Sequence, residues 1–286
     1  PELIAQHRRL DQLRDDISRL GLERNVVELE LYGYTILDDV KPLSFFDEMR
    51  KTVLELGKED EELGRTIKLA GKEGGSFLVK ELLTRAPIFE EAVLAEEPLT
   101  LATYLMGESC QISSTDGHVR AEGDVPQGMH VDTPFVPAPL PPYSHSCNVM
   151  WCMDDFNREA GGTLVVPGSH KTLNHPLPGR TARNMAVPVD AAKGSVFVFT
   201  GNLWHGAGAR TIPGYRVGMT VYFSRMYART QTPFDQLVSD DAIARNPPRF
   251  AELVGRNNPY PYAPGSYGND GKQVGGHINK TKDQRG

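Results

Sequence analysis

The sequence predicts a mainly β protein with flanking helices, whose strands form an antiparallel barrel or jelly roll. Short apolar runs alternate with glycine and proline turns over the middle and later chain, a pattern typical of such folds. The 28 glycines and 21 prolines exceed the roughly 12% combined share of an average globular chain, which favours many turns over a helical bundle. A chain of 286 residues can form one large domain with peripheral elaboration.

Helical patterns are concentrated before about residue 105. Residues 3–20 carry an apolar stripe at three-and-four spacing, and Gly21 follows it. We expect a helix there that packs on its own domain or forms a homodimer seam, because the spacing also fits short heptads. Residues 29–37 are predicted as a first strand, and 42–63 as an amphipathic helix. Two more helical segments are predicted within residues 80–105.

The later chain is predicted to be strands followed by a tail. Strand-length apolar runs with β-branched and aromatic enrichment occupy residues 150–153, 163–166, 195–199 and 216–223. The end of the chain is rich in Gly, Asn, Pro and Lys, which favours a flexible or surface-draped tail. The predicted organisation is a single domain, 1–286, divided into an N-terminal helical extension (1–28), a core with a helical first part (29–252) and a C-terminal tail (253–286).

Composition restricts the classes of partner. A net charge of −6 disfavours nucleic acids and anionic membranes, because both repel an acidic chain. No apolar run approaches the ~18 residues of a membrane span and no signal-peptide pattern opens the sequence, so a cytoplasmic protein is the default expectation. Cys110, Cys147 and Cys152 are too sparse for a disulfide framework, and Cys147 and Cys152 are expected to be small core residues.

His130, Asp132 and His205 are candidate metal ligands. In an extended segment, residues two apart point to the same face, so His130 and Asp132 can reach one ion. A chain with eight histidines and 37 acidic residues supplies about one such pair by chance. His205 follows the predicted strand 195–199 and lies among glycines, which permit close approach to a metal. Taken alone, His205 also fits an ordinary surface loop.

Arg216 adds a third feature, because it opens a mostly apolar strand eleven positions after His205. Burying a guanidinium without a partner is costly, so an inward-facing arginine implies a carboxylate from the protein or from a ligand. Two imidazoles and one carboxylate on one face of an octahedral metal leave three positions open, which suits Fe(II) and oxygen activation. A fork-shaped cation nearby suits a dicarboxylate cosubstrate.

Three segments together resemble the phytanoyl-CoA dioxygenase-like family of Fe(II)/2-oxoglutarate-dependent oxygenases. They are HVD at 130–132, GGTLVVPGSH at 161–170 and WHGAGARTIPGYR at 204–216. The resemblance extends over roughly residues 29–230 and implies a double-stranded β-helix core of the jelly-roll or cupin-like kind. It further implies a dioxygenase that uses Fe(II), 2-oxoglutarate and O2. Such an enzyme hydroxylates or otherwise oxidises an unactivated C–H bond of a small organic molecule and releases succinate and CO2.

The resemblance also implies roles for single residues. His130, Asp132 and His205 correspond to the iron ligands, and Arg216 to the residue that pairs with the distal carboxylate of 2-oxoglutarate. Further cosubstrate-binding positions are Gln127, Thr163 and Lys80, although a helix-surface lysine is the more common explanation of Lys80. Asp132 favours hydroxylation or another oxidation over halogenation, since related halogenases have a small residue in its place. His170 corresponds to a structural histidine.

The substrate is not specified by these motifs. Residues 133–146 follow Asp132 directly, contain five prolines and carry apolar side chains, which predicts a pocket wall or lid; a plain surface loop is the alternative. Candidate substrate contacts are Phe135, Tyr143, Met150 and Trp151, with core packing at least as good an explanation of the last two. An apolar wall suits an organic small molecule such as a secondary metabolite or a lipid-like acid.

Two other functions are compatible with the same triad. Zn(II) accepts two histidines and one aspartate and activates water, as in a metal hydrolase, but a hydrolase gives no reason for Arg216. The second alternative is a non-catalytic β-sandwich binding protein with a vestigial triad. The presence of all three ligands argues against it.

Overall fold

Two antiparallel sheets form the centre of the structure, with helices around them, which confirms the predicted fold class. The computed structural model describes residues 2–69, 75–179 and 181–256. A seven-stranded sheet has the order β1-β8-β5-β10-β4-β3-β2, and a three-stranded sheet has the order β7-β6-β9. The strands are β1 (Tyr34–Leu37), β2 (Ile67–Lys68), β3 (Phe77–Val79), β4 (Gln111–Ala121), β5 (Ser146–Cys152), β6 (Thr163–Val165), β7 (Val187–Pro188), β8 (Val196–Thr200), β9 (His205–Ala207) and β10 (Tyr215–Ser224).

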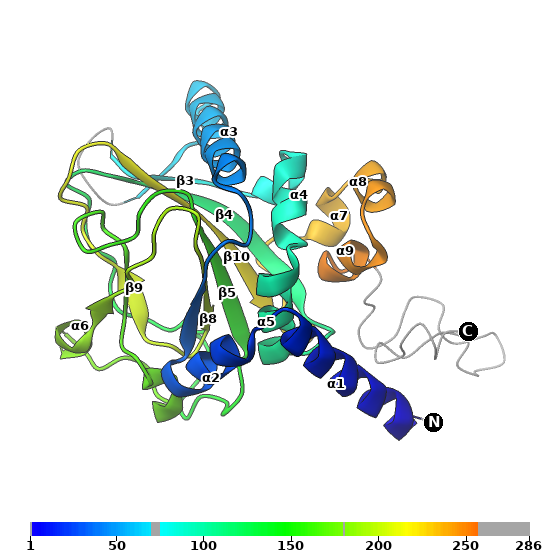
Figure 1. Ribbon diagram of the computed structural model, residues 1–286. Helices are drawn as coiled ribbons and strands as arrows, with labels where there is room; N and C mark the ends of the chain where they lie inside the picture. The colour runs from blue at the N-terminus through cyan, green and yellow to red at the C-terminus, as the bar shows by residue number, and fades with distance from the viewer. Residues whose placement is uncertain (1, 70–74, 180, 257–286) are drawn as a thin grey trace.

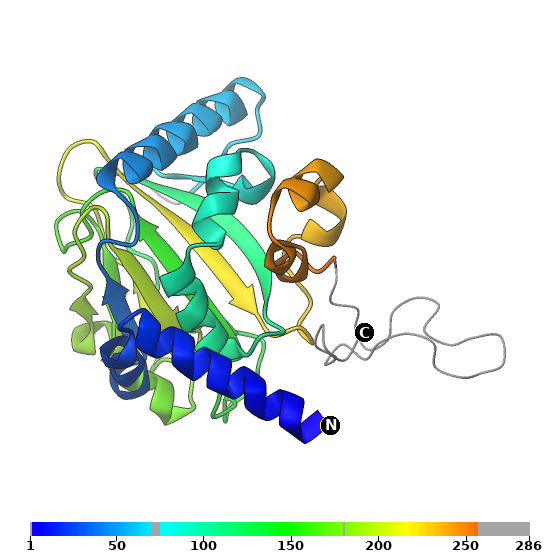
Figure 2. The same cartoon turned by 45° about the vertical axis from the view of Figure 1, so that its right-hand side comes forward.

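Helices cover one face of the large sheet, whereas α6 lies beside β9 of the small sheet (Figures 1 and 2). The helices are α1 (Glu2–Arg19), α2 (Glu23–Tyr32), α3 (Leu43–Glu62), α4 (Pro87–Val93), α5 (Glu96–Met106), α6 (Thr181–Met185), α7 (Phe234–Leu237), α8 (Asp240–Arg245) and α9 (Pro248–Leu253), with short 3-10 turns η1 (Leu82–Thr84) and η2 (Ser169–Thr172). The helices predicted at 3–20, 42–63 and within 80–105 are confirmed. The short helices α7 to α9 were not predicted.

The four predicted strands are confirmed as β5, β6, β8 and β10. The longest strand, β4, was missed, although it pairs with β10 along its whole length. Its sequence QISSTDGHVRA contains few of the β-branched and aromatic residues by which strands are found. Its polar residues face a cavity within the protein, so the strand lacks the continuous apolar run by which a buried strand is recognised in a sequence.

The first strand was predicted too early, because residues 29–32 belong to α2. Leu22 and Leu29 are buried at a spacing that a helix brings to one face. Gly33 ends the helix in the left-handed conformation, with φ of 83°. A Cβ there would lie 2.6 Å from Nδ1 of His170. Only residues 34–37 form β1, and His170 packs at this helix–strand junction.

The main core lies between the large sheet and the helices. Trp151 of β5 is fully buried, with its ring 5.9 Å and 5.5 Å from the rings of Phe45 and Phe46 in α3. Ile17 and Leu20 pack against the same core, so the N-terminal helix contacts its own domain. The homodimer stays a prediction.

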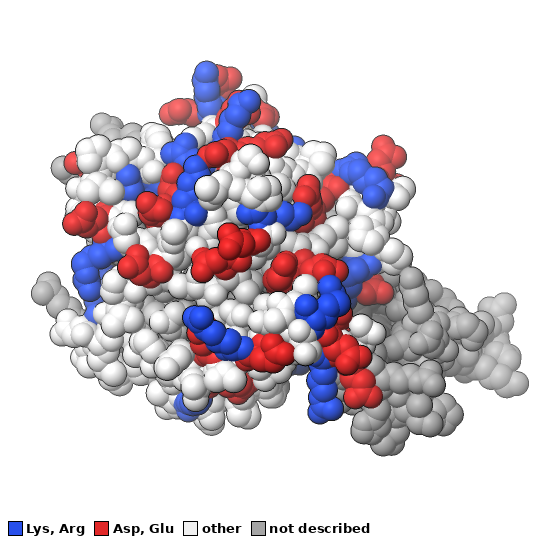
Figure 3. All heavy atoms as spheres, in the orientation of Figure 1, with Lys and Arg blue, Asp and Glu red and all other residues white. Residues whose placement is uncertain are grey.

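The structure also bears on the expectations for the cysteines, for a membrane span and for the C-terminal tail. All three cysteines are free and buried. Among the described residues, no helix has both the length and the apolarity needed to cross a membrane. On the face drawn in Figure 3, acidic and basic side chains are interspersed and form no continuous basic patch among the described residues. Most of the predicted tail, residues 257–286, lies outside the described residues.

Candidate metal centre and its cavity

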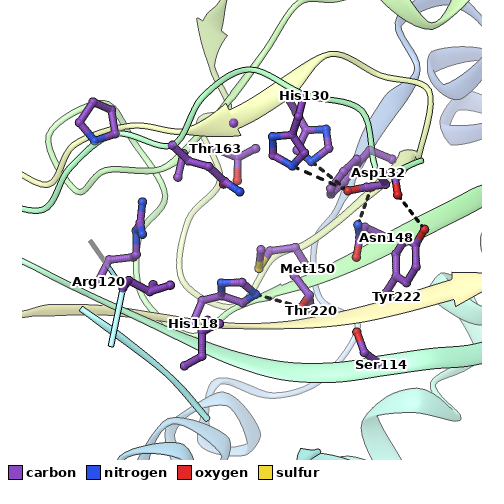
Figure 4. A pocket seen from close by; sticks show the side chains of 18 of the residues that line it. Ser114, His118, Arg120, His130, Asp132, Asn148, Met150, Thr163, Thr220 and Tyr222 are labelled. Carbon is purple, nitrogen blue, oxygen red and sulfur yellow. Dashed lines mark hydrogen bonds and ion pairs between the residues drawn. The ribbon is translucent and has the colours of Figure 1, made fainter. Parts of the chain in front are cut away.

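The structure brings His130, Asp132 and His205 together (Figure 4). Their candidate ligand atoms all lie within 4.8 Å of one another. Oδ1 of Asp132 lies 3.3 Å from Nε2 of His205 and 3.9 Å from Nε2 of His130. His130 and His205 form an isolated antiparallel bridge, so one bridge positions residues 130–132, where a strand had been expected.

Each histidine ring is oriented by a backbone carbonyl. Nδ1 of His130 lies 2.9 Å from the oxygen of Gly128, and Nδ1 of His205 lies 2.9 Å from the oxygen of Leu203. A carbonyl only accepts, so each Nδ1 carries the proton and each Nε2 keeps its lone pair. Both Nε2 atoms face Asp132 and can bind a cation.

The charge states also suit a divalent metal. Burial lowers the pKa of His130, and the neighbouring His205 lowers it further. Burial opposes ionisation of Asp132, but the two histidines and a hydrogen bond from Asn148 bring its pKa below the ordinary value. For His205, burial favours the neutral ring while Asp132 raises the pKa overall. An ionised carboxylate between imidazoles is a donor set that fits Fe(II) or another divalent first-row metal.

The triad opens on a cavity of about 500 Å³ between the two sheets. Met150 and Phe199 line it from the large sheet, while Thr163 and Gly206 line it from the small one. Figure 4 shows the metal-site residues at one side of the cavity and Arg120 with His118 at the other.

Arg216 is a buried cation in this cavity, with only 3% of its surface exposed. Its guanidinium carbon lies 4.1 Å from the centre of the Phe156 ring. Its Nε is buried without a hydrogen-bond partner, and among the described residues no carboxylate forms an ion pair with it. Burial lowers its pKa to about 9, with the nearby Arg120 contributing. Such a group calls for an anionic ligand.

Arg120 lies opposite Arg216 in the pairing of β4 with β10. It differs from Arg216 because its Nε is 2.5 Å from Oδ2 of Asp124, whose side chain is fully buried. The three groups together carry one net positive charge. One carboxylate from outside the protein would balance this charge.

Two further cosubstrate candidates line the cavity and one does not. Thr163 begins β6, and Gln127 lies where its backbone N–H donates to the oxygen of Ala207. Lys80 follows β3 and is absent from the cavity wall. Its Nζ lies 2.6 Å from Oδ2 of Asp116, so the lysine pairs with a protein carboxylate rather than extending from a helix surface.

Of the substrate candidates, only Met150 lines the cavity. Trp151 points to the opposite face of β5, since successive strand residues alternate. Phe135 is 97% exposed, and Tyr143 is half-exposed beneath the guanidinium of Arg225. Leu140 of the same proline-rich segment packs in a separate apolar cluster. The structure therefore places this segment outside the cavity wall.

Several cavity residues were not singled out from the sequence, and they share one position, the inner face of the large sheet. They are Ser114 and Arg120 of β4, Asn148 of β5, and Thr220 and Tyr222 of β10. His118 of β4 also lines the cavity, with Nε2 3.2 Å from the hydroxyl of Thr220. Strict alternation along β10 was the available signal: polar 216, 220 and 222 against apolar 217, 219 and 221.

Comparison with known proteins identifies the family. The phytanoyl-CoA dioxygenase (PhyH) family matches residues 29–218. The chain belongs to this family. Its members are Fe(II)/2-oxoglutarate-dependent oxygenases, and the matched residues contain the whole triad and Arg216. The family match agrees with the fold and with the resemblance read from the three segments.

The sequence relatives of this chain include both dioxygenases and uncharacterized proteins. An uncharacterized protein of Mycobacterium tuberculosis is 30% identical over 266 residues, covering 89% of this chain and 90% of its own. A dioxygenase of Aspergillus fumigatus, af480, is 28% identical over 158 residues, covering 54% of this chain and 51% of its own. The solved structure of HygX from Streptomyces hygroscopicus, with nickel and 2-oxoglutarate bound, has a TM-score of 0.58 at 15% identity. It covers 73% of this chain and 89% of that chain, and it shows a shared fold.

Proposed function

We propose that this protein is a dioxygenase that uses Fe(II), 2-oxoglutarate and O2 to hydroxylate or otherwise oxidise a C–H bond of a small organic molecule. The products from the cosubstrate are succinate and CO2. The observation that carries the proposal is Arg216, a buried guanidinium without a protein carboxylate, in the same cavity as the triad. The nickel and 2-oxoglutarate bound in the fold neighbour HygX support it.

In this proposal, His130, Asp132 and His205 hold the metal through two Nε2 atoms and Oδ1. The metal supplies the activation of O2, and the protein supplies binding and orientation. Arg216 receives the distal carboxylate of 2-oxoglutarate through its guanidinium fork, while Phe156 holds the guanidinium from one face. Thr163 contributes a hydroxyl in the same cavity.

The remaining wall of the cavity favours a polar substrate. Hydrogen-bonding side chains on the inner face of the large sheet include Ser114, His118, Asn148, Thr220 and Tyr222. Oδ1 of Asn148 is buried without a hydrogen-bond partner, and a fatty acyl chain would leave it so, at a cost of about 1–3 kcal/mol. We therefore favour a metabolite with hydrogen-bonding groups over a lipid-like acid. Because Asp132 occupies the carboxylate position, oxidation is favoured over halogenation.

A hydrolase with Zn(II) in the same triad accounts for less of the structure. It explains the ligands, but it leaves the buried charge of Arg216 without a role. A non-catalytic β-sandwich binding protein with a vestigial triad gives no reason for the complete set of three ligands. The dioxygenase accounts for all of them.

Succinate release tests the proposal. We expect Fe(II)-dependent and 2-oxoglutarate-dependent succinate formation by the wild type, stimulated by members of a metabolite library. Asp132→Ala and His130→Ala should abolish it, and Arg216→Met should abolish it at cosubstrate concentrations that saturate the wild type. Lys80→Met is the matched control, because it removes a cation outside the cavity wall. Undiminished turnover in Asp132→Ala, with verified metal content, would overturn the proposal.

A further inference from the structure

Asp132 depends on neighbouring elements for its position. It lies outside the named strands, and only its neighbour His130 forms a bridge. Its backbone N–H donates to the oxygen of Gly201 at 2.9 Å. Its carbonyl oxygen accepts from the hydroxyl of Tyr222 at 3.1 Å, and its Oδ2 accepts from Nδ2 of Asn148 at 2.7 Å. The two side-chain contacts are drawn as dashed lines in Figure 4.

Both donor residues, Asn148 and Tyr222, lie on inner strands of the large sheet. Asn148 and Tyr222 are paired residues of β5 and β10, two inner strands of the seven-stranded sheet. Asn148 is 6% exposed. A rigid strand pair therefore fixes both the main chain and the side chain of a residue that lies on a less regular segment.

The amide of Asn148 has one permitted orientation. An ionised carboxylate is only an acceptor, so the NH2 group must face Asp132. This bond engages Oδ2 and turns Oδ1 toward the histidines, 3.3 Å from Nε2 of His205. A neutral donor satisfies the buried oxygen without cancelling the negative charge that attracts a metal cation.

We propose that Asn148 is a positioning residue for the metal centre: its hydrogen bond holds Oδ2 of Asp132, so that Oδ1 is the oxygen that binds the metal. Tyr222 adds a weaker constraint through the backbone of Asp132. This inference rests on the proposed function of the triad as a metal site. It assigns a function to a cavity residue that is not one of the three candidate metal ligands.

The test is metal affinity, measured independently of turnover. Apo protein is titrated anaerobically with Co(II), and the dissociation constant is compared among wild type, Asn148→Ala, Asn148→Asp and Tyr222→Phe. We expect about 10–100-fold weaker binding for Asn148→Ala, as for other residues that orient a metal ligand. Asn148→Asp should bind still more weakly at neutral pH, because two carboxylates would face each other. Tyr222→Phe should show the smallest loss.

Asn202→Ala is the matched control. Asn202 is also buried, and its Nδ2 donates to the oxygen of Pro141 at 2.9 Å rather than to a triad residue. Its Co(II) affinity should equal that of the wild type. The isosteric Asn148→Asp guards against failure of Asn148→Ala to fold, and thermal unfolding of each apo protein verifies the fold.

The outcomes of these titrations distinguish a wrong role for Asn148 from a wrong assignment of the metal site. Wild-type Co(II) affinity in folded Asn148→Ala and Asn148→Asp would overturn the role of Asn148 while leaving the metal site intact. An equal loss in Asn202→Ala would also overturn it, because general loosening would then explain the effect. A wild-type protein that binds no Co(II) would instead overturn the metal site itself, and this inference with it.

Discussion

The two faces of the seven-stranded sheet both carry buried residues, and they differ chemically. Along β10, the residues at 216, 218, 220 and 222 face the cavity, while those at 217, 219, 221 and 223 face the helices. Arg216 is 3% exposed and its neighbour Val217 is fully buried, so exposure does not distinguish them. The difference teaches that one strand serves two purposes: its outer residues pack in the core, and its inner residues line the cavity.

The largest expected effect is on the helix-facing side, at Trp151. We expect Trp151→Ala to lower the free energy of unfolding by about 3–5 kcal/mol, because it empties a fully buried site among Phe45 and Phe46. Urea unfolding measures this. Met150→Ala, one position away on the cavity side, should cost less, since its side chain lines a cavity. Equal losses would remove the distinction between the faces.

Arg216→Met should produce the opposite pattern. We expect 2-oxoglutarate affinity to fall by about 2–5 kcal/mol, the usual cost of removing one partner of a buried charge pair. The free energy of unfolding of the ligand-free protein should be unchanged or higher, since a buried unpaired charge is replaced by an apolar chain. Calorimetric titration measures the 2-oxoglutarate affinity, and urea unfolding measures the free energy of unfolding. A large loss of stability would mean that Arg216 holds the fold.

His118 should make stability depend on pH. Burial lowers its pKa to about 4 from an ordinary 6.5, with Asp116 opposing and nearby cations reinforcing the shift. The unfolded chain therefore takes up the proton first, and stability falls as the pH drops from about 6.5 to about 4. The loss should reach at most about 3 kcal/mol.

The measurement for His118 is unfolding in urea at pH 7 and at pH 4.5, for wild type and His118→Gln. The decline between the two pH values should be smaller in His118→Gln. Parallel declines would show that His118 is protonated as easily in the folded state as in the unfolded chain.

The smallest expected effects come from two isosteric single substitutions at neighbouring positions of β10. Val221→Thr places a hydroxyl in the helix-facing core and should cost about 1–3 kcal/mol. Thr220→Val removes a hydroxyl near His118 and the oxygen of Asp116 and should cost less, about 0.5–1.5 kcal/mol. Thermal unfolding of both variants measures the difference. A reversed order would place residue 221, rather than 220, on the polar side.

The sequence predicted the helix-facing side better than the cavity side. Strands such as β5 and β8 were found because they carry apolar residues on both faces, whereas β4 was missed because its inner face carries Ser114, His118 and Arg120. The triad and Arg216 could be proposed because short motifs mark them. Asn148 and Tyr222 could not, because their contacts with Asp132 join residues that are 16 and 90 positions apart in the sequence, which no local pattern encodes.

Residues 133–146, which were predicted as a pocket wall or lid, show the same limit of local sequence patterns. Prolines and apolar side chains made residues 133–146 a reasonable candidate, but the chain path decides which way each side chain points. Phe135 points to solvent, while Leu140 joins an apolar cluster with Val131 and Trp204. A tertiary arrangement of this kind overrides the local composition.

The most direct test of the account is an anaerobic titration of the wild type with Fe(II) and then 2-oxoglutarate, followed by visible absorption. We expect a weak metal-to-ligand charge-transfer band that requires both additions, is absent in Asp132→Ala, and needs far more 2-oxoglutarate in Arg216→Met. Absence of the band in wild-type protein that has bound Fe(II) would contradict the account.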